Sequence, residues 1–87
     1  MGKKFIDVTA HFDMEGKIIP VMFWWEDGKS YQIDRVLDIR RSASLKAGGI
    51  GIRYTCRILG KNRYLYYDDY TSKWFVEVPD DFRTTSI

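Results

Sequence analysis

Residues 50–58, IGIRYTCRI, decide the fold because apolar and polar residues alternate there more regularly than elsewhere in the chain. Side chains two positions apart in a strand point to the same face of a sheet. The segment therefore predicts a strand with one apolar face made by Ile52, Tyr54, Cys56 and Ile58. A free cysteine on such a face is typical of a buried thiol that plays no part in chemistry.

The same period of two recurs on both sides of this segment. It predicts strands over residues 6–12, 17–25, 30–41, 63–69 and 73–78. Turn residues separate them at 13–16, at the Asp27-Gly28 pair, at 60–62 and at 70–72. Pro20 has no amide proton, so we expect an edge position or a bulge near it. Val36 is out of phase with its neighbours, which suggests a bulge or a second buried face.

About six short antiparallel strands in 87 residues predict an all-β domain. The meander must curl to bury its apolar face, which gives a small barrel or a half-open roll. Residues 42–48 lose the alternation and form at most one short helical turn, with a loop equally compatible. We expect a single domain over residues 1–78 and a polar tail over 79–87.

The run KAGGIG, residues 46–51, raises the question of a phosphate-binding loop. Such a loop needs a helix after its glycines, because the helix N-terminus supplies amide donors. Here a strand pattern follows, and Lys46 precedes the glycines instead of following them. The glycines are therefore interpreted as structural, marking the passage from loop to strand.

Few residue types suited to catalysis or metal binding are present. One cysteine and one histidine, His11, fall short of a structural zinc set and exclude an intrachain disulfide. No nucleophile lies in a recognisable pattern with a base, so we expect no enzyme, no metal and no cofactor. The N-terminal lysines are followed by Asp7 and not by a long apolar run. We therefore expect neither a signal peptide nor a membrane anchor, and a cytoplasmic location.

Charge is distributed unevenly. Residues 35–63 hold eight arginines and lysines against one acid, Asp38, whereas the rest of the chain holds six basic and eleven acidic residues. A basic segment of this kind suits an anionic partner. The alternative is that the basic strands lie beside acidic ones, which neutralise them within the protein.

Adjacent aromatic residues occur at 23–25, 66–67 and 74–75, so each segment places rings on both faces of the sheet. Rings outside the core predict a ligand or a partner, although the pattern leaves open whether Trp24 or Trp25 faces outward. A Gly60 hairpin with three or four loop residues would place Arg53 opposite Asp68 or Asp69. Other arginines have no such evident acidic partner. The candidate contact residues are these arginines and the aromatic residues that can face outward: Arg40, Arg41, Arg57, Arg63, Tyr64, Tyr66, Trp24 and Trp25.

The blocks WWEDGKSYQIDRVLDIR, GIRYTCRI and YLYYDDYTSKWFVEV resemble a family of small uncharacterised all-β proteins of bacteria, chiefly of the Firmicutes type. The likeness covers residues 5–78. It implies a stand-alone bacterial protein and carries no catalytic residues or activity.

Arginines interleaved with aromatic residues on a sheet suit single-stranded nucleic acid, because bases stack on rings and guanidinium groups meet phosphates. The leading hypothesis is a non-catalytic β module that binds nucleic acid or another anionic partner, such as an acidic protein. The alternative is a protein-interaction module that forms a homodimer through its outward-facing rings. A membrane partner is not expected.

Overall fold

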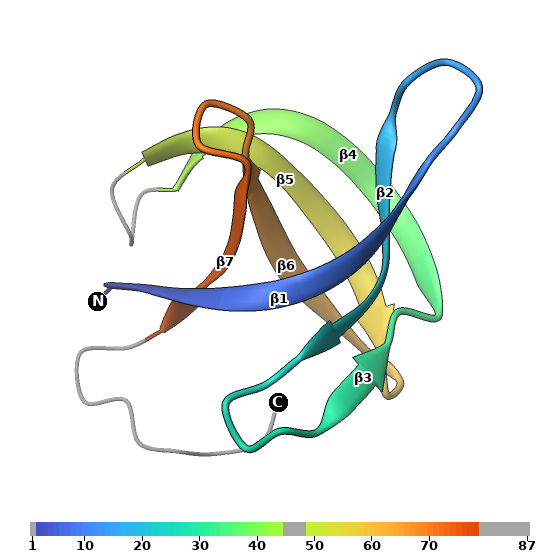
Figure 1. The fold of residues 1–87 in the computed structure, drawn as a ribbon, viewed down its shortest axis with the longest axis vertical. Coiled ribbons are helices and arrows are strands. Elements are labelled where there is room, and N and C mark those ends of the chain that lie inside the picture. The colour runs from blue at the N-terminus through green and yellow to red at the C-terminus, as the bar shows by residue number, and fades with distance from the viewer. Residues whose placement is uncertain (1, 45–48, 79–87) are drawn as a thin grey trace.

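The computed structural model describes residues 2–44 and 49–78 of the chain (Figure 1). Seven strands lie in one antiparallel sheet of order β3-β2-β1-β7-β6-β5-β4. They are β1 (Gly2–Phe12), β2 (Ile18–Trp24), β3 (Ser30–Gln32), β4 (Arg35–Ser44), β5 (Gly49–Ile58), β6 (Lys61–Asp68) and β7 (Lys73–Val78). The described residues contain no helix capable of crossing a membrane. The all-β antiparallel meander predicted from the sequence is confirmed.

β3 and β4 together replace the single third strand expected over residues 30–41. Ile33 donates its amide proton to the Val21 carbonyl at 2.9 Å, and Asp34 donates to the Arg57 carbonyl at 2.9 Å. The chain thus changes partner from β2 to β5 between two successive residues. This change draws the ends of the sheet together into the curled half-barrel of Figure 1.

Two irregularities bend the strands where the sequence indicated. The register of β1 with β2 shifts next to Pro20, which pairs with Ala10. The register of β4 with β5 shifts between Val36 and Asp38, so that Leu37 is the extra residue. Both expected bulges are confirmed, and each increases the local twist that a curled sheet requires.

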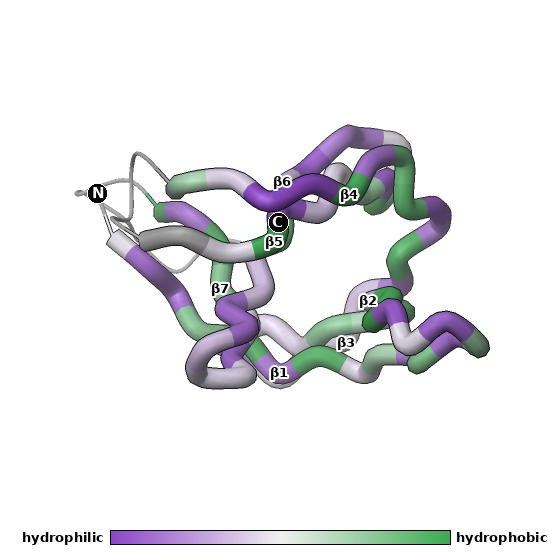
Figure 2. Tube along the Cα trace, turned by 90° about the horizontal axis from the view of Figure 1, so that it is seen from above, coloured by the Kyte–Doolittle hydropathy of each residue, from purple (hydrophilic) through white to green (hydrophobic). Residues whose placement is uncertain are grey.

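The core lies on the concave side of the sheet, with strands around it on several sides (Figure 2). Cys56 is fully buried there, as predicted, and burial raises the pKa of its thiol to about 12. Tyr54 crosses this interior and donates its phenolic proton to the Ile18 carbonyl at 2.6 Å. The hydrogen bond joins β5 to β2, two strands that are not paired with each other. The other large buried side chains of the cluster include Phe23, Trp25, Ile58, Leu65 and Trp74.

The turns at residues 13–16 and at Asp27-Gly28 are confirmed, with φ of 83° at Gly16 and 82° at Gly28. The turn expected at 60–62 is present at Gly60, but its expected bounds are wrong. Leu59 and Gly60 alone form the loop, with φ of 51° and 75°, and β6 begins at the next residue.

Residues 42–44 belong to β4, so the expected helical turn does not begin there. The rest of that expectation, residues 45–48, lies outside the described residues, as does the tail over 79–87. Gly51 lies inside β5, where an added Cβ would be 2.6 Å from the Tyr67 carbonyl oxygen. That glycine is structural, as interpreted from the sequence.

Candidate nucleic-acid interface

The strand registers place a basic grid on the outer side of β4, β5 and β6, opposite the core. Three rows of directly paired residues run across these strands. We call this grid the arginine–tyrosine face, and its rows are Arg35–Arg57–Asn62, Asp38–Thr55–Tyr64 and Arg40–Arg53–Tyr66.

Tyr64 occupies the middle row of the face, and its side chain is 48% exposed. The guanidinium carbon of Arg53 lies 4.5 Å from the centroid of its ring, a cation–π contact. The Nε atom of Arg53 is buried and has no hydrogen-bond partner in the described part of the chain. Arg53 is thus held against the ring by stacking and not by an acidic neighbour.

Arginines oppose arginines twice on this face. Arg35 lies directly opposite Arg57, and Arg40 lies directly opposite Arg53. Like charges in such positions destabilise an antiparallel pair. The only acid on the face is Asp38, whose carboxylate accepts a hydrogen bond of 2.7 Å from Nε of Arg40.

The remaining charges of the face have few partners. The bond to Asp38 raises the pKa of Arg40. Arg57 donates a hydrogen bond of 3.1 Å to the Asn62 side-chain oxygen, which leaves its charge uncompensated. The Arg35 side chain is exposed and forms no hydrogen bond or ion pair within residues 2–44 and 49–78. Positive charge therefore exceeds negative charge on this face.

Three of the eight candidate contact residues, Arg40, Arg57 and Tyr64, lie on the accessible part of this face. Tyr66 belongs to the same face but is only 3% exposed, stacking on Phe75 with ring centroids 5.1 Å apart. Its hydroxyl donates to the Glu77 carboxylate at 3.2 Å, and its pKa is raised, chiefly by burial. This pair of outward-facing rings is therefore covered within the chain.

The other four candidates lie elsewhere. Arg41 points to the inner side of β4 and forms an ion pair of 2.6 Å with Asp69. Arg63 pairs with Cys56 and so faces inward, with a buried Nε atom. Trp25 is buried, whereas Trp24 is 37% exposed on β2, away from the face. The sequence therefore grouped residues that the fold separates.

Two expectations about charge pairing were wrong. Arg53 lies opposite Tyr66 and not opposite Asp68 or Asp69, because the hairpin loop has two residues instead of three or four. Arg40 and Arg41 both have acidic partners, which the sequence did not reveal. Sequence reasoning also missed Arg35 and Asn62 as members of this face. The loop length sets the register of β5 with β6. A two-residue loop predicted from the sequence would therefore have placed Asn62 opposite Arg57.

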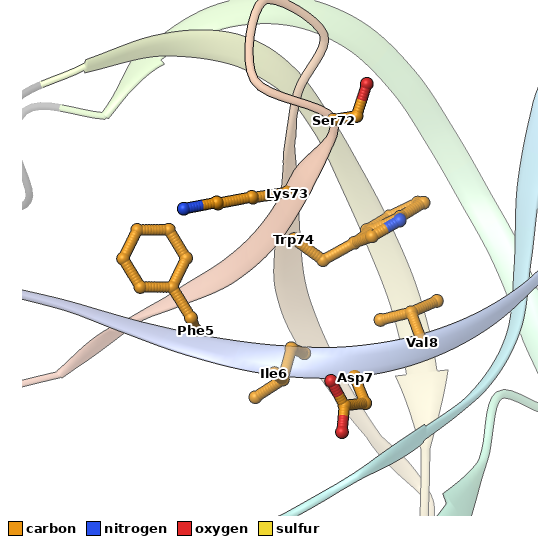
Figure 3. Close-up of a pocket in the computed structure, with 7 residues that line it drawn as sticks. All are labelled: Phe5, Ile6, Asp7, Val8, Ser72, Lys73 and Trp74. Carbon is orange, nitrogen blue, oxygen red and sulfur yellow. The ribbon is translucent and has the colours of Figure 1, made fainter.

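A hollow of about 510 Å³ lies away from this face, where β1 and β7 diverge (Figure 3). It is lined by Phe5, Ile6, Asp7, Val8, Ser72, Lys73 and Trp74. The Lys73 ammonium group lies 5.4 Å from the centroid of the Phe5 ring. No group of three potential metal ligands exists among the described residues. This hollow thus offers one carboxylate and one ammonium group, without a histidine or cysteine beside them.

Comparison of the sequence with protein-family models, with curated proteins and with solved structures found no match. The resemblance to a bacterial family stays a prediction. Function is therefore inferred from the geometry of the sheet.

Proposed function

We propose that this protein binds single-stranded nucleic acid on the arginine–tyrosine face. The observation that carries the proposal is the pair of Arg–Arg oppositions, Arg35 with Arg57 and Arg40 with Arg53, in the rows that flank the exposed ring of Tyr64. This combination suits a chain of phosphates and bases, and we propose a non-catalytic binding role in the cytoplasm.

Like-charge pairs directly opposite each other in an antiparallel sheet cost stability in the free protein. Phosphate groups lying across β4 and β5 would turn that repulsion into attraction and release counterions. Arginine suits this role because its planar guanidinium group donates two parallel hydrogen bonds to a phosphate.

The ring of Tyr64 supports a single-stranded ligand over a duplex. A base stacks on an aromatic ring only when that base is accessible, which in a duplex requires unstacking. Stacking of this kind is worth about 1–3 kcal/mol per base and tolerates any sequence. Arg53, beneath the same ring, adds positive charge close to the stacked base. Binding is therefore expected to show little sequence preference.

The direct test is a titration of the protein into a labelled, mixed-sequence single-stranded oligonucleotide, followed by fluorescence anisotropy. Four arginines in contact with phosphates predict a slope of log K against log salt of about −3. Arg57→Ala and Tyr64→Ala should each weaken binding, and Tyr64→Ala by about tenfold or more. Lys17→Ala serves as the control, because it removes one exposed positive charge outside the sheet.

Two results contradict the proposal. One is the absence of binding at low salt. The other is a loss of affinity in Lys17→Ala equal to that in Arg57→Ala, since this outcome would mean that only net charge matters.

A further inference from the structure

β4 ends the sheet, so one of its long edges has no paired strand among the described residues. The direction of its amide groups follows from the hairpin between β5 and β6. A two-residue loop at 59–60 makes Ile58 and Lys61 a hydrogen-bonded pair. By alternation, even-numbered residues of β5 direct their amides to β6, and odd-numbered residues direct theirs to β4.

Thr55 and Arg53 therefore direct their amides to their partners on β4, Asp38 and Arg40. Ile39 lies between these partners, so its N–H and C=O groups point away from β5, to the open edge. An unpaired edge of this length is a template for another strand. What can pair with it depends on the side chains beside Ile39.

The order Asp38, Ile39, Arg40 is complementary to itself. When two copies of β4 pair antiparallel with Ile39 opposite Ile39, each Asp38 lies opposite the Arg40 of the other copy. Neighbouring registers place like charges opposite each other. A register centred on Asp38 pairs two carboxylates, and one centred on Arg40 or Arg41 pairs two guanidinium groups. Charge thus selects one register.

Apolar surface lies beside the same edge. The Ile39 side chain is 41% exposed although it points to the inner side of β4. It lines a groove of about 680 Å³ between β2 and β4, together with Val21, Val36 and Leu37. In the register centred on Ile39, the Ile39 side chains of the two copies lie next to each other on the same side of the sheet. Their contact removes apolar surface from water, which favours association.

We propose that a second copy of this chain pairs with the open edge of β4, antiparallel and centred on Ile39. The Asp38–Arg40 ion pair within each copy would be replaced, so that two such ion pairs join the two copies. The dimer would also join two arginine–tyrosine faces edge to edge, a consequence that matters for binding only if the proposed function holds. Self-association itself requires no nucleic acid.

The test is sedimentation equilibrium of the free protein at concentrations up to about 1 mM. Asp38→Arg and Arg40→Asp each place like charges opposite each other, so each should weaken dimerisation at least about tenfold. An equimolar mixture of the two variants should recover dimers, because opposite charges then meet at both positions. The thermal midpoint of each variant serves as the control for folding.

Ile39→Pro is a second, independent variant, since it removes an amide that points to the open edge and leaves the β4–β5 ladder intact. It should abolish dimerisation while the far-ultraviolet circular dichroism spectrum remains unchanged. A wild-type protein that stays monomeric up to the highest concentration overturns the proposal. So does a dimer that persists in both charge variants, or a mixture that fails to associate better than either variant alone.

Discussion

Arg35 and Arg57 lie directly opposite each other on β4 and β5, and no acid separates them. A sheet selected for stability alone would place a carboxylate or a neutral residue at one of these positions. Sites that bind charged ligands commonly keep arrangements that cost stability in the free protein. The opposition of these two arginines therefore connects the stability of the sheet to its proposed function.

Arg35→Thr should raise the free energy of unfolding by about 0.2–0.5 kcal/mol at low salt, because it removes a like-charge opposition at an exposed site. The gain should disappear near 1 M salt, where the Debye length is about 3 Å. Urea denaturation at both salt concentrations measures it. Lys17→Thr, outside the sheet, is the control, and an equal gain there would refute the explanation.

Tyr54→Phe should lower the free energy of unfolding by about 1–2 kcal/mol, because the Ile18 carbonyl loses its hydrogen bond inside the curl of the sheet. Chemical denaturation gives this quantity directly. Tyr64→Phe removes a hydroxyl from an exposed ring and should change stability very little. Equal effects of the two substitutions would show that the hydrogen bond between β5 and β2 contributes nothing specific.

Gly51→Ala should destabilise the fold by about 1–3 kcal/mol, since the new methyl group would lie 2.6 Å from the Tyr67 carbonyl oxygen. The backbone of β6 would have to move to relieve this contact. Gly2→Ala is a matched control, because nothing lies within 4 Å of its added Cβ. Thermal unfolding compares the two variants, and a wild-type midpoint for Gly51→Ala would contradict the close approach.

Arg41 holds the pKa of the Asp69 carboxyl below its ordinary value of 3.8, chiefly through their hydrogen bond. A lowered pKa in the folded state means that this pair stabilises the protein above pH 3.8. The contribution is lost as the pH falls through the folded-state pKa. A carbon-detected NMR titration should show a higher Asp69 pKa in Arg41→Ala. The control Arg40→Ala should leave it unchanged, and an unchanged value in both variants would exclude Arg41 as the cause.

The strands and the inner face could be predicted from the sequence because alternation is a local property. Residues 50–58 identified β5, and the phase of that alternation placed Cys56 in the core. Pro20 and Val36 disturbed the pattern at the positions where the register shifts. Each of these inferences needs only the neighbours of a residue along the chain.

The grid of the candidate site could not be predicted, because it depends on register and on the partner of each strand. Leu59 adopts a positive φ, which is unusual for a leucine, so the two-residue loop had no clear sequence signal. The passage of the chain from β2 to β5 at Ile33 and Asp34 depends on tertiary pairing. The oppositions of Arg35 with Arg57 and of Arg40 with Arg53 cannot be predicted without the loop length and the change of strand partner.

Binding on the arginine–tyrosine face is measured most directly by amide chemical-shift mapping by NMR, with a single-stranded oligonucleotide of roughly ten nucleotides added stepwise at low salt. If the arginine–tyrosine face binds the oligonucleotide, the largest changes fall on β4, β5 and β6, around Arg53, Thr55, Arg57 and Tyr64, and they reverse when salt is added. Changes confined to β1, β2 or the β1–β2 turn, or none at all, would contradict binding on this face.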